Sequence, residues 1–90
     1  MGTEFDPKKN AANLANHGVS LAAVDGVLLD PLALTTEDDS VRGEARWVAL
    51  GMNTFGALMV VVWTQRGERT RLISVRIAQP KERRNYAKGI

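Results

Sequence analysis

The chain of 90 residues has no cysteine and a single histidine, His17. Disulfide scaffolds and thiol chemistry are therefore excluded. A zinc set is not available either, because one histidine cannot supply it and no HExxH or EF-hand spacing is present. The acidic run Glu37–Asp39 is typical of a solvated loop. We accordingly expect no metal and no cofactor.

Long apolar runs are also missing, since no stretch approaches the 18 apolar residues or more of a membrane span. The first residues, MGTEFD, lack the apolar segment of a signal peptide and the Ser or Thr that a myristoylation signal has at position 6. The glycines are scattered through turns, so no phosphate-binding loop exists, and no serine has the context of a catalytic triad. We expect a single cytoplasmic domain over residues 1–90.

What the chain does have is positive charge near its end. Residues 1–24 are balanced and residues 25–62 carry a net charge of −4. Residues 63–90 carry +6, from eight basic side chains against Glu68 and Glu82. This asymmetry favours a polyanion or an acidic protein as the partner of the last third. A solvated, charged strand and helix would have the same composition, so charge alone leaves both interpretations open.

Two helices are expected in the first third of the chain. Asp6 is a good N-cap, Pro7 suits the first helical position, and Gly18 suits the left-handed position after the last turn. A second, short helix is expected over residues 19–30, capped by Ser20, because apolar residues recur there at helical spacing. These residues are Leu21, Val24, Val27 and Leu28.

Beyond Pro31 the hydrophobic period changes from about four residues to two, which indicates strands. We expect strands over residues 32–36, 45–52, 57–65 and 69–78, with the almost continuous apolar run ALMVVVWTQ in the middle of the sheet. Pro80 opens a short closing helix. The fold class is therefore α+β: two N-terminal helices, a four-stranded antiparallel meander and one C-terminal helix.

The chemistry that remains is that of arginine, which binds two phosphate oxygens at once and never loses its charge near neutral pH. Such a surface is suited to RNA and to metal-independent cleavage, in which the 2′-hydroxyl attacks the adjacent phosphate and guanidinium groups stabilise the developing charge. A proton acceptor and a donor are then needed, from His17, Tyr86, a lysine or a carboxylate. Any single arginine here is equally consistent with a surface strand residue.

Several segments, in this order along nearly the whole chain, resemble the BrnT-type toxins, ribonucleases of the RelE-like superfamily from bacterial type II toxin–antitoxin pairs. They are FDPKKNAANLANHGVS, DPLAL, GEARWVALG, LMVVVWTQRGERTRLISVRIA and ERRNY. Two positions depart from the usual pattern, because Phe5 stands where the family has Trp and Asn16 where it has Lys. The resemblance implies a RelE-like fold and an endoribonuclease that blocks translation.

It also implies a partner, a BrnA-type antitoxin with a ribbon-helix-helix DNA-binding domain, so that operator DNA is reached only through the antitoxin. Carried over by motif, the catalytic candidates are His17, Glu44, Arg46, Arg71, Arg76 and Tyr86. The RNA-binding candidates are Lys8, Lys9, Arg66, Arg69, Lys81 and Arg84.

Two questions stay open at the level of sequence. Arg71 and Arg76 are an odd number of residues apart, so either a bulge brings them to one face or only one is in the site. We favour Arg76, expecting Ser74 and Leu72 to share its face. His17 is either catalytic or a cap of the first helix. The rival function is a non-catalytic module whose basic face binds RNA or an acidic protein.

Overall fold

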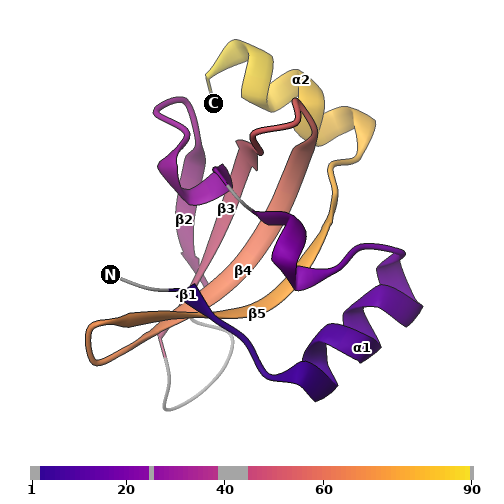
Figure 1. Ribbon diagram of the computed structural model, residues 1–90. Helices are drawn as coiled ribbons and strands as arrows, with labels where there is room; N and C mark the ends of the chain where they lie inside the picture. Colours follow the sequence, from indigo (N-terminus) through magenta and orange to yellow (C-terminus); the bar gives the residue numbers. More distant parts are fainter. Residues whose placement is uncertain (1–2, 25, 39–44, 90) are drawn as a thin grey trace.

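The computed structural model describes residues 3–24, 26–38 and 45–89 (Figure 1). One five-stranded sheet, in the order β1-β5-β4-β3-β2, is its centre. The strands are β1 (Thr3–Glu4), β2 (Leu34–Asp38), β3 (Arg46–Met52), β4 (Leu58–Arg66) and β5 (Arg69–Ile77). The helices are α1 (Pro7–His17), the 3₁₀ helices η1 (Leu21–Val24) and η2 (Val27–Leu29), and α2 (Pro80–Lys88). None of these helices is long and apolar enough to cross a membrane.

The first helix begins and ends as its sequence predicts. The carboxylate of Asp6 accepts a hydrogen bond from the Lys8 backbone N–H at 2.9 Å, and Pro7 occupies the first turn, where no N–H is needed. Gly18 takes the left-handed conformation (φ 70°), and its N–H bonds the Leu14 carbonyl. Both ends of α1 therefore follow from local capping chemistry.

The second helix expected over residues 19–30 is instead two 3₁₀ helices, η1 and η2. Gly26 stands between them in the left-handed region (φ 87°), where a helix cannot continue. A Cβ at Gly26 would lie 2.7 Å from Thr54 Cγ2, so glycine also permits the close approach of the β3–β4 turn. The predicted cap is present, because Ser20 Oγ accepts from the Ala22 N–H at 3.1 Å.

The antiparallel meander β2–β3–β4–β5 is confirmed, with β4 at the centre of the sheet. Its first strand lies two residues later than expected, at Leu34–Asp38. The fifth strand, β1, was not predicted, because two residues are too short for a hydrophobic pattern. It pairs in parallel with β5, placing Glu4 opposite Arg71.

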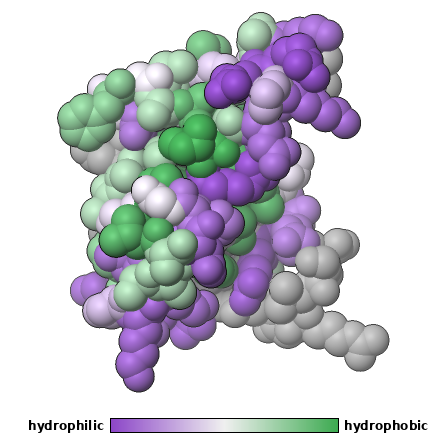
Figure 2. Space-filling model, turned by 90° about the vertical axis from the view of Figure 1, so that its right-hand side faces the viewer, coloured by the Kyte–Doolittle hydropathy of each residue, from purple (hydrophilic) through white to green (hydrophobic). Residues whose placement is uncertain are grey.

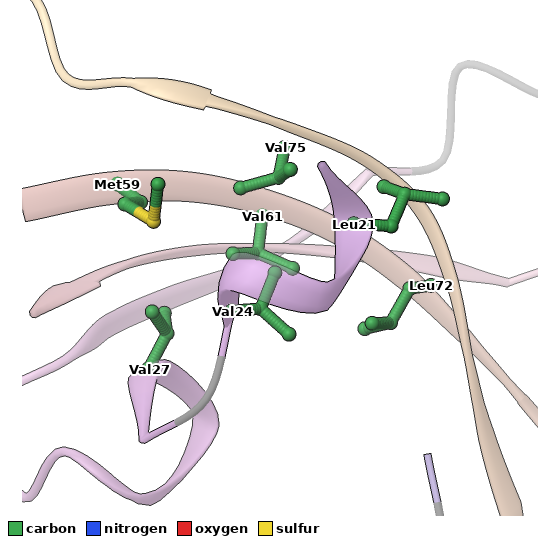
Figure 3. Close-up of a cluster of buried hydrophobic side chains, with 7 residues drawn as sticks. All are labelled: Leu21, Val24, Val27, Met59, Val61, Leu72 and Val75. Carbon is green, nitrogen blue, oxygen red and sulfur yellow. The ribbon is translucent and has the colours of Figure 1, made fainter. Parts of the chain in front are cut away.

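The main core lies between the sheet and the 3₁₀ helices (Figure 3). Side chains from η1 and η2 meet apolar side chains of β4 and β5 there. The cluster consists of Leu21, Val24, Val27, Met59, Val61, Leu72 and Val75. In Figure 1 both 3₁₀ helices lie over one face of the sheet, which we call the helix face. The stacked rings of Trp47 and Trp63, with centroids 5.0 Å apart, come from neighbouring strands of that face.

A smaller core lies on the opposite face, which we call the open face, beneath α2. Leu50, Val60 and Ala78 are buried there, and Tyr86 packs against them from α2. The predicted start of α2 is present, with Pro80 in the first turn and a capping box between Gln79 and Glu82. Helix α2 thus covers one end of the open face and leaves the other end uncovered by a helix.

Candidate nucleic-acid interface

One row of polar side chains crosses the open face from edge to edge. Each of the five strands contributes one residue, and neighbours in the row are paired in the sheet register. The members of this polar row are Glu4, Arg71, Thr64, Arg46 and Asp38. In a pleated sheet such directly paired residues point to the same face. The pattern therefore brings together two arginines that lie 25 residues apart in the chain.

A β-bulge answers the question of Arg71 and Arg76. Strand β5 has one residue more than β4 between the pairs Val62–Ser74 and Trp63–Leu72. The extra residue shifts the alternation of β5 by one, so the partners of Val60, Val62 and Thr64 all lie on the open face. These partners are Arg76, Ser74 and Arg71. The bulge thus places both arginines on one face.

The same bulge corrects the expectation that Leu72 shares this face. Leu72 pairs with Trp63 and is buried in the main core, together with Val75 three residues later. Two core residues at an odd spacing are possible only because the strand changes phase between them. Ser74, in contrast, lies on the face of Arg76 as expected.

Both arginines of the polar row have a nitrogen atom without a partner. The Nε atoms of Arg46 and Arg71 are buried and make no hydrogen bond within the described part of the chain. Arg71 does form an ion pair with Glu4 (3.0 Å), in which each side chain is about a quarter exposed. An unpaired buried donor is costly, so a shift of the covering side chains that lets an acceptor such as a phosphate oxygen reach these two N–H groups is favoured.

Beside Ser74, a shallow depression of about 200 Å³ separates α1 from β5. Its lining includes Lys9 and His17 of α1 and Ile73 and Ser74 of the bulge. The structure therefore places two predicted residues of α1 next to the strand that carries Arg71 and Arg76. His17 also lies in the last turn of α1, where a basic side chain favours the negative end of the helix dipole.

Arg76 is engaged by α2. Its two terminal nitrogens donate to the two carboxylate oxygens of Glu82 at 2.8 and 2.7 Å. This bidentate bond lowers the pKa of Glu82 and raises the pKa of Arg76. Glu82 also accepts from the Gln79 N–H at 2.8 Å, which completes the capping box. The start of α2 is thereby joined to the open face.

Tyr86 lies at the far end of that face from the polar row. Its hydroxyl donates to Asp30 Oδ2 at 2.5 Å, and the same oxygen accepts from the Met52 N–H at the end of β3. The bond to Tyr86, followed by those to Met52 and Leu32, lowers the pKa of Asp30, and Asp30 in turn raises the pKa of Tyr86. Six residues of strand, about 20 Å, separate Met52 from Arg46.

The remaining predicted residues are spread over the surface. Lys8 of α1 and the hairpin residues Arg66 and Arg69 are exposed. Lys81 and Arg84 are exposed on α2. Glu44 lies outside the described residues. The structure thus places Arg46, Arg71 and Arg76 on one face of the sheet, His17 in the depression between α1 and β5, and Tyr86 at the far end of that face.

Four residues important to this geometry were not singled out as site residues from the sequence. Asn13 is buried, and its amide bonds both the N–H and the carbonyl of Val75, at 3.0 and 2.8 Å. It therefore holds α1 against the free edge of β5. Thr64, Glu4 and Asp30 support the polar row and α2. The sequence itself does not separate Asn13 from Asn10 and Asn16 of the same helix.

The fold and the open face together define a small α+β protein that presents arginines on a sheet. The model of the family "Ribonuclease toxin, BrnT, of type II toxin-antitoxin system" matches residues 5–82, most of the chain. The chain therefore belongs to the BrnT family of ribonuclease toxins.

Among solved structures, the chain is similar to the Brucella abortus ribonuclease toxin BrnT, determined at 1.1 Å resolution. The two share 23% sequence identity with a TM-score of 0.68, over 88% of this chain and 97% of that one. At this identity the likeness shows the fold. No curated protein matches this chain. The expected BrnT fold is thus confirmed.

Proposed function

We propose that this chain cleaves RNA on its open face without a metal ion. The observation that carries the proposal is the polar row, where the buried Nε groups of Arg46 and Arg71 have no partner in the described chain and flank Thr64. Two guanidinium groups on one row match the paired oxygens of a phosphate. Arg76 and Ser74, on the same face, extend this surface along β5 toward α2.

The reaction needs only groups of this chain and the RNA. The 2′-oxygen attacks the adjacent phosphorus, the bond from phosphorus to the 5′-oxygen breaks, and a 2′,3′-cyclic phosphate and a 5′-hydroxyl result. Arg71 and Arg46 stabilise the negative charge that builds on the phosphate oxygens in the transition state. One proton leaves the 2′-hydroxyl and one joins the departing 5′-oxygen, so the net proton count is unchanged.

We assign the first proton transfer to His17. Imidazole is the most common general acid–base group in enzymes, and His17 lines the depression beside Ser74. Lys9, in the same depression, adds positive charge for the phosphate backbone. Tyr86 is less suited to accept a proton, because its hydroxyl already donates to Asp30 and its pKa is raised. For the second transfer, to the departing 5′-oxygen, Glu44 is the remaining candidate.

In the cell, the proposed activity blocks translation in the cytoplasm until a BrnA-type antitoxin with a ribbon-helix-helix domain covers the toxin. Operator DNA is then bound through the antitoxin alone. The exposed basic residues around the face provide the sequence-independent part of RNA binding, which should weaken as salt rises. These residues are Lys8, Lys9, Arg66, Arg69, Lys81 and Arg84.

The test is cleavage of total RNA by the purified chain in excess EDTA. We expect fragments that end in a 2′,3′-cyclic phosphate, and no cleavage of the same RNA with 2′-O-methyl groups, because the attacking hydroxyl is then blocked. Intact RNA at high protein excess would support the rival, a non-catalytic module that only binds. Cleavage seen only after a divalent cation is added would contradict the metal-independent route.

A further inference from the structure

A cluster of exposed apolar side chains lies at the end of the sheet opposite the polar row. Among the described residues, Phe55 is 86% exposed and Leu29 is 84% exposed, and Leu32 and Met52 are exposed as well. We call these four residues the apolar patch. Large exposed apolar side chains that gather in one place mark sites where another molecule binds.

The backbone contacts hold the four residues at one end of the fold. The carboxylate of Asp30 accepts from the Leu32 N–H and the Met52 N–H, both at 2.9 Å, which joins the segment after η2 to the end of β3. Leu29 is the last residue of η2. Phe55 belongs to the β3–β4 turn, whose Thr54 lies directly against Gly26. Residues from two distant segments are therefore held together.

Helix α2 borders the patch and is basic, whereas the patch is apolar. Tyr86 of α2 donates to the same Asp30 that joins Leu32 and Met52. The outer side of α2 carries the exposed residues Lys81, Arg84 and Lys88, at the i, i+3, i+7 spacing that makes one stripe of a helix. Figure 2 shows hydrophilic residues over the α2 end, adjoining hydrophobic ones.

We infer that the apolar patch and the basic stripe of α2 form the binding site for an acidic, amphipathic segment of the antitoxin. The inference rests on the proposed function in one respect, namely that the partner is the antitoxin of this toxin family. Apolar side chains of the segment cover Leu29 and Phe55, and its carboxylates pair with the stripe. This arrangement has the apolar centre and charged rim of a stable protein interface.

A second copy of this chain fits the same surface less well. A symmetric dimer would place the same patch on both sides and bring the two basic α2 helices toward one another. Like charges brought together across an interface oppose association. An acidic partner has the opposite effect, and long-range attraction to the stripe speeds the encounter.

The experiment measures antitoxin binding and RNA cleavage on the same proteins. The double variant Leu29→Ser, Phe55→Ser removes the two most exposed side chains of the patch, and Leu14→Ser, an exposed leucine on α1, is the matched control. The binding partner is the purified antitoxin encoded beside this gene. We expect the double variant to bind it at least about a hundredfold more weakly, because central apolar residues dominate such interfaces. The double variant should cleave RNA as fast as the parent. Leu14→Ser should match the parent in both antitoxin affinity and RNA cleavage.

Hydrogen exchange on the unaltered protein gives a second test of where the antitoxin binds. On adding the antitoxin, the amides of residues 28–33 and 53–57 should exchange more slowly. Unchanged affinity of the double variant, or no protection of these amides, would overturn the inference. So would self-association of the parent that the double variant abolishes, because the patch would then serve a second copy. If the parent binds the antitoxin through the patch but cleaves no RNA, the proposed function fails and the docking surface stands.

Discussion

Arg76 and Glu82 join β5 to α2 through two parallel hydrogen bonds of 2.8 and 2.7 Å. The pair is partly exposed, with side chains 34% and 25% accessible, so a phosphate can reach it from the open face. Because the guanidinium is already bonded to a carboxylate, a phosphate has to compete with Glu82. Arg71 is also paired, but through a single bond of 3.0 Å to Glu4, and the Nε atoms of Arg46 and Arg71 have no partner among the described residues. We therefore propose the polar row as the stronger phosphate site.

The Arg76–Glu82 pair and the bond from Tyr86 to Asp30 together predict how stability depends on pH. The pKa of Glu82 and that of Asp30 are lowered from ordinary values of 4.5 and 3.8, chiefly by Arg76 and Tyr86 respectively. Their unfolded forms therefore take up protons first as the pH falls. The stabilisation is complete above these ordinary values and is lost as the pH falls through the folded pKa values. We expect Tm to fall steeply between about pH 5 and pH 2.

Two variants test whether Glu82 is responsible for part of this loss of stability. In Glu82→Gln the drop in Tm over the acid range should be smaller than in the parent, since one titrating group with a lowered pKa is gone. Glu68→Gln, at the exposed β4–β5 turn, is the control and should follow the parent curve. Parallel curves for Glu82→Gln and the parent would show that the pair with Arg76 does not contribute to acid stability.

Asn13→Ala should destabilise the fold. The substitution leaves the N–H and carbonyl of Val75 without their partner in a buried setting. Groups left unsatisfied in this way cost about 1–3 kcal/mol, and in a domain of this size Tm should fall by about 10 °C. Asn16→Ala, an exposed position on the same helix, should melt close to the parent. Equal melting of both variants would mean that the Asn13 amide does not hold α1 to the sheet.

Tyr86→Phe tests whether the hydroxyl of Tyr86 takes part in catalysis. The hydroxyl donates to Asp30, about 20 Å along β3 from Arg46. We expect the variant to melt earlier, because α2 loses an attachment, and to cleave RNA at no less than about a tenth of the parent rate, since a general acid or base typically contributes about a hundredfold or more. A loss of more than a hundredfold, with the fold intact, would make Tyr86 a catalytic residue.

His17→Ala should lower cleavage by about a hundredfold or more, the usual contribution of a general base. RNA affinity should change much less, because the arginines and lysines provide most of the binding. Measuring kcat and KM separately distinguishes the two effects. If KM rises while kcat is unchanged, His17 is a binding residue, and the assigned proton transfer belongs to another group.

The sequence was sufficient for elements whose signals are local. The Asp6 and Gly18 caps of α1, the alternation in β3 and the proline before α2 each depend on a few adjacent residues, and all were predicted. The break of the second helix at Gly26 is different, because the close approach of Thr54 that requires a glycine there is a tertiary contact. Strand β1 has two residues, and it exists because β5 offers an edge at Thr70 and Arg71.

The candidate site depends even more on contacts between residues that are distant in the sequence. Arginines on the last hairpin were expected from composition, but their shared face depends on one extra residue in β5, which no alternation rule predicts. The pairing of Arg46 with Thr64 requires the register of β3 and β4, and the bonds of Arg76 and Tyr86 require the position of α2. These relationships join residues distant in sequence, so they appear only once the chain is folded.

The central claim is that the polar row binds the phosphate that reacts. The measurement that tests it most directly is the single-turnover rate of RNA cleavage in EDTA for Arg71→Ala, with Arg83→Ala, an exposed arginine of α2, as the control. Loss of one donor to transition-state charge typically costs about a hundredfold or more. The account predicts such a loss for Arg71→Ala and an unchanged rate for Arg83→Ala, with both variants folded. A folded Arg71→Ala protein that cleaves as fast as the parent would contradict it.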